Sequence, residues 1–408
     1  MEILHLKAKN DDIPVIFENS KELNVAYLKL IFKASGVCMQ KIPGLAKLSA
    51  MILNEGEKDM GSSLFAKELE KRAISMYASV GFETFTIEIN CLKEHFGFTL
   101  DMLKKLLKNP NTSGQSLEKC KNITLGEIAN NQNDNDYLAR CGLMQILYPD
   151  TNLATPSIGT QESIGSIKLK DIKDYLNDAL DLKNLFIVFG GDVNKGEISL
   201  LQDITNVIKS NKKLSLEKLQ TSQRGSVKEI IKQSEQAYIY FGSPYNVAED
   251  EKYMASIATF ILGEGGFGAR LMEEIRVKRG LAYSAYARNL FSLSHSQIFG
   301  YLQTKNESKD EAISVVREEF TKFITNGVSD KELEQAKKFL LGSLPLRLET
   351  LFKRFAIAQG EFYQGKEIGD FLKELEKIKN LKLDDLNNFI KQHDEITKLS
   401  FCVLRNEI

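Results

Sequence analysis

The segment EEIRVKRGLAYSAYA, residues 273–287, carries the side chains best suited to chemistry in this sequence. Arg276 and Tyr283 stand seven residues apart, and Gly280 between them is expected to end a helix. An arginine on a last helical turn and a tyrosine opening the next strand can point at one spot. A guanidinium and a phenol there polarise a carbonyl or hold a developing oxyanion. On spacing alone, a solvated arginine and a core tyrosine are the favoured interpretation, and the catalytic pair is the alternative.

Candidate metal ligands are few. The four histidines are isolated from one another along the chain: His5, His95, His295 and His393. This scatter speaks against a site built from several histidines, the commonest design for catalytic zinc. The run Cys91-Leu-Lys-Glu94-His95 mimics an inverted zinc motif with cysteine first, but such ligands must share one helical face. We predict instead that Cys91 ends a strand and that a helix begins near Lys93.

A glycine-rich run also invites a functional interpretation. Gly263-Glu-Gly265-Gly-Phe-Gly268 satisfies the pattern GxGxxG. A dinucleotide fingerprint must follow a strand, because its glycines carry the turn into the helix that holds the pyrophosphate. Here the run follows the helical stretch 252–262. We therefore predict a flexible turn between helices and no nucleotide site.

The elements that must position these residues come from a repeat. Four pairs of segments match in the same order at offsets of 206 to 216 residues: MILNEGE with FILGEGG, EKRAISMYAS with VKRGLAYSAY, LEKCKNITLGEI with LEQAKKFLLGSL, and IKLKDIKDYL with LKLDDLNNFI. One fold of about 200 residues used twice explains this pattern. We predict an N-terminal domain over residues 1–209, a polar linker over 210–228 and a homologous domain over 229–408.

Apolar periodicity gives the type of fold. Alternation predicts half-buried strands at residues 26–34, 83–91, 237–241 and 298–304. Helical spacing predicts helices at residues 63–72, 95–107, 167–179, 311–324 and 331–343. Strands covered by helices, outside a strict βαβ order, predict an α+β protein of two homologous α/β sandwich domains.

Composition narrows the partners and the compartment. Of 408 residues, 54 are basic and 55 acidic, so the net charge of −1 predicts no nucleic-acid or acidic-membrane partner. No apolar run reaches the length of a membrane span. The first residues alternate like a strand and do not read as a signal peptide, and the five cysteines are scattered without a CxxC pair. We expect the cytoplasm, with the periplasm open if a leader has been removed.

At the level of motifs the chain resembles a known family. GGFGARLMEEIRVKRGLAYSAYA is similar to the C-terminal-half signature of the insulinase/pitrilysin-like and mitochondrial-processing-peptidase family of zinc peptidases, and TPSIGTQESIGSI (residues 155–167) resembles a second family segment. The resemblance covers essentially the whole chain. It implies two domains arranged as a clamshell, with Arg276 and Tyr283 as the pair that assists catalysis. It also implies that extended peptides add to a sheet edge, for which the strand 81–89 is the candidate.

The same resemblance exposes a departure at the metal site. The family binds zinc through an inverted HxxEH motif on a first-half helix and a glutamate about 75 residues later. In the corresponding stretch, Lys47 and Met51 replace the two histidines and Ala50 replaces the catalytic glutamate, while Glu127 keeps its identity. One carboxylate does not hold zinc, and no base remains to activate water. The resemblance thus implies a member with a degenerate metal motif that binds no cofactor of its own.

The lone ligand position leads to a structural expectation. A carboxylate buried where a cation once sat is costly unless another positive charge replaces that cation. We predict that Lys47 approaches Glu127 and that Met51 fills the vacated space. The alternative is that Lys47 extends to solvent and Glu127 pairs elsewhere.

These features favour a non-catalytic subunit of a heterodimeric zinc peptidase. Such a chain binds extended peptide and supplies Arg276 and Tyr283 in trans to the zinc of a homologous partner that carries HxxEH. The partner is that homologous subunit or a second copy of this chain. One alternative is a non-hydrolytic peptide-binding or scaffold protein. Another is an autonomous zinc endopeptidase with atypical ligands, including His95.

Overall fold

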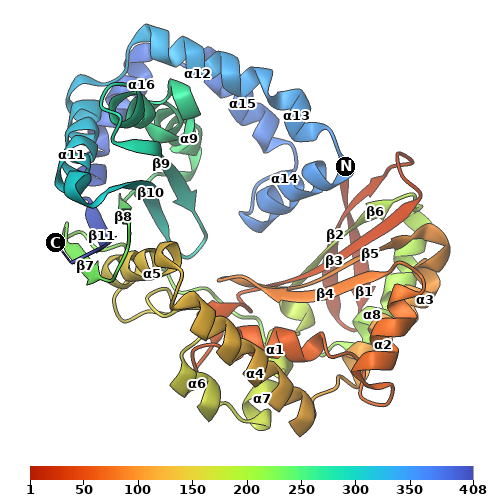
Figure 1. Ribbon diagram of the computed structural model, residues 1–408. Helices are drawn as coiled ribbons and strands as arrows, with labels where there is room; N and C mark the ends of the chain where they lie inside the picture. The colour runs from red at the N-terminus through yellow and green to blue at the C-terminus, as the bar shows by residue number, and fades with distance from the viewer. Residues whose placement is uncertain (408) are drawn as a thin grey trace. The chain divides into compact units, whose positions relative to one another are not determined.

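The computed structural model describes residues 1–407, in which helices pack against two mixed β-sheets (Figure 1). The predicted α+β class is confirmed. The chain folds as two compact units. The first contains residues 1–130, 156–216 and 349–368, and the second contains residues 131–155 and 217–348 together with the chain from 369 onward.

The first unit is built on a sheet with the strand order β1-β2-β6-β3-β5-β4. Strands β2 and β6 are parallel and the other neighbours are antiparallel. The strands are β1 Glu2–Ala8, β2 Asp11–Asn19, β3 Val25–Lys33, β4 Ser75–Val80, β5 Thr84–Leu92 and β6 Leu185–Gly191. The helices of this unit are α1 Leu45–Leu53, α2 Gly61–Glu70, α3 Phe96–Lys108, α4 Gly114–Asn131, α6 Gln161–Ser166, α7 Leu169–Ala179, α8 Gln202–Val207 and α14 Leu351–Tyr363.

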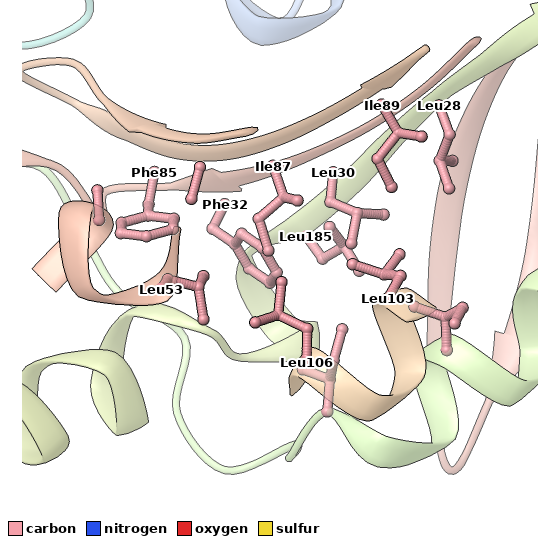
Figure 2. Close-up of a cluster of buried hydrophobic side chains, with 14 of the residues drawn as sticks. Leu28, Leu30, Phe32, Leu53, Phe85, Ile87, Ile89, Leu103, Leu106 and Leu185 are labelled. Carbon is pink, nitrogen blue, oxygen red and sulfur yellow. The ribbon is translucent and has the colours of Figure 1, made fainter. Parts of the chain in front are cut away.

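The main core of this unit lies between the sheet and helices α1 and α3. Figure 2 shows leucine and phenylalanine side chains of β3 and β5 meeting leucines of those helices. The labelled residues are Leu28, Leu30, Phe32, Leu53, Phe85, Ile87, Ile89, Leu103, Leu106 and Leu185. Each such side chain contributes about 1.5–3 kcal/mol when it leaves water, so this layer fixes α1 against the sheet.

The second unit repeats the topology of the first. Its sheet has the order β7-β11-β8-β10-β9, which is the order β2-β6-β3-β5-β4 transposed to the second half of the chain. In each set, the strand that comes first in the sequence and the strand that comes last are parallel neighbours: β2 and β6 in the first unit, and β7 and β11 in the second. This shared permutation is the structural form of the predicted internal duplication. The strands are β7 Val227–Ile231, β8 Gln236–Pro244, β9 Ala282–Phe291, β10 Ser296–Lys305 and β11 Ser400–Arg405.

Helices cover this second sheet as well. They are α5 Asn135–Leu147, α9 Lys252–Thr259, α10 Arg270–Met272, α11 Lys309–Asn326, α12 Asp330–Gly342, α13 Leu344–Leu348, α15 Asp370–Asn380 and α16 Leu383–Gln392. One face of the sheet meets α9, α11, α12, α15 and α16 in a single core. The opposite face packs on α5, where Leu143 and Leu147 lie against Tyr240 and Cys402.

Each unit takes one helix from the other half of the sequence. Helix α5 belongs to the first half of the chain and packs on the second sheet, whereas α14 belongs to the second half and packs on the first sheet. Both follow corresponding members of the repeat, α4 and α12. The sequence division at 1–209 and 229–408 contains no sign of this exchange, because periodicity does not indicate which sheet a helix covers.

The exchange changes one expectation about burial. Strand β3 was predicted to be half-buried, but both of its faces are largely buried. Tyr27 stacks on Phe355 of α14 with ring centroids 5.5 Å apart, and Lys33 lies 4.6 Å from the ring of Phe362. Burial lowers the pKa of Lys33. The polar residues of the alternating pattern therefore lie under a helix that comes from the far end of the sequence.

The prediction that the strand 81–89 forms an edge of the sheet is wrong. The predicted strand 81–89 corresponds to β5, which pairs with β3 on one side and β4 on the other. The edge of the sheet is β4, the strand before it. The alternating run 83–91 is the stronger strand signal, and sequence alone does not reveal that the weaker segment Ser75–Val80 pairs outside it.

Residues 210–226 form no helix or strand, and β7 begins at Val227, inside the predicted linker of residues 210–228. Two other predictions on local structure are confirmed. Cys91 lies at the end of β5, and a short 3-10 turn leads into α3. The run 263–268 follows helix α9, with a π-helical turn at Phe260–Glu264 and a 3-10 turn at Gly266–Gly268. Within the described part of the chain, every helix is too short or too polar to cross a membrane.

The packing of α5 can be tested at Gly142. A Cβ at this position lies 2.4 Å from Sγ of Cys402, so Gly142→Ala forces the helix away from β11. We expect a loss of about 1–3 kcal/mol in the free energy of unfolding, measured by urea denaturation. Adding Cys402→Ala removes the sulfur, so the double variant is expected to lose less than the sum of the two single losses.

Gly126→Ala in α4 is the matched control. A Cβ there meets nothing within 4 Å, so the gain in helix propensity raises stability by about 0.5–1 kcal/mol. If Gly142→Ala behaves like Gly126→Ala, α5 does not pack on this strand in solution.

Candidate functional site

The degenerate motif lies on α1, whose start is held by a second segment with family resemblance. Gly44 precedes the helix with φ of 87°, and a Cβ on it lies 2.6 Å from the carbonyl oxygen of Ile158. Gly159 has φ of 86° and approaches the carbonyl of Pro43 in the same way. Only glycine combines this backbone conformation with such a close approach. The degenerate motif and the segment 155–167, which also resembles the family, therefore meet at the first turn of α1.

Lys47 and Glu127 form the predicted contact. Nζ of Lys47 donates to Oε1 of Glu127 on α4 at 2.5 Å. The premise of a buried carboxylate is wrong, however, because the Glu127 side chain is 45% exposed and that of Lys47 is 30% exposed. An ion pair with this exposure contributes about 0–1 kcal/mol to stability. The pair neutralises the former ligand position more than it stabilises the fold.

The neighbouring motif positions are apolar. Ala50 is 4% exposed and belongs to the core, and Met51 is partly buried against that core. The hydroxyl of Thr124, one turn before Glu127 on α4, lies 3.4 Å from Sδ of Met51. A methionine sulfur fills an irregular space between helices well. The space between α1 and α4 thus holds a thioether and an ion pair.

Residues 1–407 contain no group of three or more His, Cys, Asp or Glu side chains that could hold a metal ion. His95 lies 3.6 Å from Glu94, and the buried thiol of Cys91 points to the carbonyl of Ala26. These three side chains do not converge on one point. The residues at the position of the metal motif therefore do not fit a zinc ion.

The second unit holds the arginine and tyrosine. Arg276 lies on a π-helical turn, Glu273–Val277, and Tyr283 is the second residue of β9. Gly280 between them has φ of 63°. The guanidinium carbon of Arg276 is 4.3 Å from the ring centroid of Tyr283 and 4.7 Å from that of Phe267. The predicted pair is therefore in contact, and an aromatic residue of the glycine-rich run completes a three-residue stack.

The two rings of this stack are exposed, and Arg276 is partly buried against them. Tyr283 is 81% exposed and Phe267 is 67% exposed. Within the described residues the side chain of Arg276 forms no ion pair and no hydrogen bond, whereas the nearby Arg279 binds Glu274 at 2.6 Å. Two aromatic faces hold the guanidinium plane without occupying its N–H donors. The N–H donors of Arg276 are therefore not engaged by other groups of the described residues.

A partly buried ion pair anchors the start of the same segment. Arg270 donates from Nε to Oε1 of Glu332 on α12 at 2.5 Å and from an Nη to the carbonyl of Gly327 at 2.8 Å. Burial alone raises the pKa of Glu332, but Arg270 and Ser329 donate to the carboxylate and lower that pKa to about 2. The segment that carries Arg276 is thereby fixed to the N-terminus of α12.

Comparison with known proteins agrees with these features. Residues 166–340 match the family model described as the peptidase M16 inactive domain. A Helicobacter pylori protein named non-peptidase homolog YmxG is 38% identical, over 99% of this chain and 94% of that protein.

The chain belongs to the M16 peptidase family.

Other relatives in the family carry different names. A Bacillus subtilis protein named uncharacterized zinc protease YmxG is 25% identical, over 74% of this chain and 73% of its own length. A crystal structure of a peptidase M16 inactive domain from Pseudomonas fluorescens matches with a TM-score of 0.89 at 22% identity, covering 100% of this chain and 98% of that one. This last likeness establishes the shared fold.

Sequence reasoning missed residues that hold the site. Phe267 lies inside the glycine-rich run 263–268, and the pattern of that run gave no sign that its ring contacts Arg276. Glu332 carried a recognisable sign as the third helical residue after Ser329, which forms a capping box with it. Its bond to Arg270, 62 residues earlier, had no sign in the sequence.

The anchor gives a prediction that depends on pH. The folded pKa of Glu332 lies below the ordinary 4.5, so its contribution is present above pH 4.5 and is lost as the pH falls towards 2. We expect Glu332→Gln to lower the free energy of unfolding by about 2–3 kcal/mol at pH 7. That difference from the parent protein should shrink below pH 4.5 in urea titrations. Glu334→Gln is the control, since Glu334 forms only an exposed pair with Lys337 and should cost about 0–0.5 kcal/mol. A pH-independent difference for Glu332→Gln would contradict the assignment.

The motif positions can be tested by restoring the missing ligands. The combined variant Lys47→His, Ala50→Glu, Met51→His places two imidazoles one helical turn apart, facing Glu127. We expect it to retain about one zinc per chain after dialysis, measured by elemental analysis, and the parent chain to retain no stoichiometric zinc. Adding Glu127→Ala to the combined variant should abolish retention. A restored variant without zinc would show that α1 and α4 no longer present these positions to one point.

Proposed function

We propose that this chain is the non-catalytic member of a two-chain M16 peptidase. In this role it binds extended peptide and presents Arg276 and Tyr283 to a peptide carbonyl at the zinc of a partner that carries HxxEH. The observation that carries the proposal is the partly buried, unpaired guanidinium of Arg276, which lies against the exposed rings of Phe267 and Tyr283. If Arg276 had no ligand to bind, its guanidinium would be more stable beside a carboxylate, as the guanidinium of Arg279 is beside Glu274.

The chemistry of the first unit supports this division of labour. Lys47 cannot act as a zinc ligand while it is protonated and paired with Glu127, and Ala50 offers no base to a water molecule. Hydrolysis therefore needs zinc and a glutamate from another chain. The name of the Helicobacter pylori relative, a non-peptidase homolog, agrees with a member of the family that does not cleave peptide by itself.

The compartment is part of the proposal. The five cysteines, Cys38, Cys91, Cys120, Cys141 and Cys402, are all free. Burial raises the pKa of Cys402 to about 12 and that of Cys120 to about 11, so these thiols resist conversion to the reactive thiolate. Buried unpaired thiols suit a reducing compartment, which supports the cytoplasm.

The test is to purify the tagged chain from its native cell and to assay the complex with a fluorogenic peptide library. We expect a homologous HxxEH chain of similar length to accompany it. Arg276→Ala should lower kcat of the complex about 100-fold, because one donor to the developing oxyanion is lost, while assembly stays unchanged. Arg279→Ala is the matched control and should leave kcat at the parent level.

Two outcomes would contradict the proposal. If the Arg276→Ala complex cleaves peptide at the parent rate, Arg276 does not assist catalysis. Purification without any HxxEH chain favours the non-hydrolytic peptide-binding or scaffold protein instead.

A further inference from the structure

A side chain is hydrogen-bonded to the free edge of β4. In an antiparallel pair, alternate residues turn their N–H and C=O groups towards the partner strand, and the others turn them away. Gly81 donates to the carbonyl of Thr84, which places the odd-numbered residues of β4 in the ladder with β5. The outward groups therefore belong to Met76, Ala78 and Val80. A strand that adds to this edge must pair with these three residues.

The central one of the three is already bonded. Asn54, the C-cap of α1, donates from Nδ2 to the carbonyl of Ala78 at 2.9 Å and accepts from the amide of Ala78 at 2.7 Å. Its carboxamide imitates one residue of a neighbouring strand, with one donor and one acceptor in place. Within the described chain, the outward backbone groups of Met76 and Val80 have no hydrogen-bond partner.

The place of Asn54 follows from the fold. The core between α1 and β4 fixes the end of the helix at this edge, since Leu53 and Ala78 both belong to the core. In the repeat, Gly263 stands at the position of Asn54, and its Cα lies so close to edge strand β9 that a Cβ comes within 2.4 Å of the amide of Ala287. The same position touches the edge strand in both units. In the first unit there is room for a side chain, and that side chain is an amide.

We propose that Asn54 is a displaceable stopper that controls the addition of an extended peptide to β4. The proposal rests on the peptide-binding part of the proposed function and adds the residue that limits it. The occupant must be an extended backbone, because the unpaired groups of Met76 and Val80 repeat at the two-residue spacing of a strand. Asn54 is exposed, so its side chain can turn into water when the peptide takes its place.

The proposal gives an ordered series of variants. Asn54→Ala removes both bonds to Ala78, so an added strand no longer has to displace them, and binding should tighten about tenfold. Asn54→Asp keeps the acceptor for the Ala78 amide and loses the donor, so its gain should be about threefold. Asn177→Ala on α7 is the matched control on the surface of the same unit and should bind as the parent does.

The experiment uses the full chain and a labelled, uncharged ten-residue peptide without proline. Affinity is measured by fluorescence anisotropy, and a second peptide with alternate backbone nitrogens methylated serves as a probe that cannot complete the ladder. The tenfold gain should appear with the first peptide and be absent with the second. Amide exchange by NMR should show Ala78 protected in the parent protein and unprotected in free Asn54→Ala.

The outcomes separate the stopper from the proposed function. Equal affinities of the parent and Asn54→Ala, or rapid exchange of the Ala78 amide in the parent, overturn the stopper and leave peptide binding intact. If neither the parent protein nor any variant, including Asn54→Ala, binds the peptide, both the stopper and the peptide-binding role are overturned. The assisting role of Arg276 is judged separately, by the activity of the two-chain complex.

Discussion

Both sheets carry large apolar side chains on their two faces, and this single constraint governs the architecture. A sheet of this kind is stable only when both faces are removed from water. The helices next to each sheet in the sequence cover one face, and a helix from the other half of the chain covers the second face. Gly142 and the stacking of Tyr27 on Phe355 show how closely these exchanged helices approach.

The same burial makes the candidate sites rigid. Helix α1 is held by the core below it and by the glycine contacts at its first turn, so Lys47, Met51 and Asn54 occupy set positions. The segment that carries Arg276 is held by the bond between Arg270 and Glu332. Sites on such supports keep their geometry without a ligand.

Replacement of a metal site by neutral packing has a clear physical outcome here. An ammonium at Lys47 balances the charge of Glu127, but unlike a zinc ion it cannot coordinate a water molecule and lower the pKa of that water. Met51 fills the neighbouring space and offers no ionised ligand. The first unit therefore keeps the shape of an M16 domain without the means to activate water. In the second unit, the side chain of Arg276 has no such ion-pair partner among the described residues, and this observation underlies our proposal that it binds a peptide carbonyl.

Features of the fold and of the candidate site could be predicted where the residues involved lie close together in the sequence or belong to a family motif. Periodicity located β3, β5, α3 and α12, and the spacing of Arg276, Gly280 and Tyr283 indicated a contact that lies within eight residues. The family motif indicated that Lys47 and Glu127 meet, although they are 80 residues apart. The position of β4 outside β5, the bond from Asn54 to Ala78 and the stacking of Phe267 left no sign in the pattern.

By itself the sequence determined the duplication and the α+β class, because both depend on residue types at set local spacings. The loss of the metal triad followed from the resemblance to the family, whose motif positions are occupied here by Lys47, Ala50 and Met51. Only the tertiary structure decided which helix covers which sheet, which strand forms the edge and how exposed the ion pair at Glu127 is. These properties arise from contacts between distant segments. The free energy of such contacts depends on shape and burial in three dimensions, which the order of residues along one segment does not reveal.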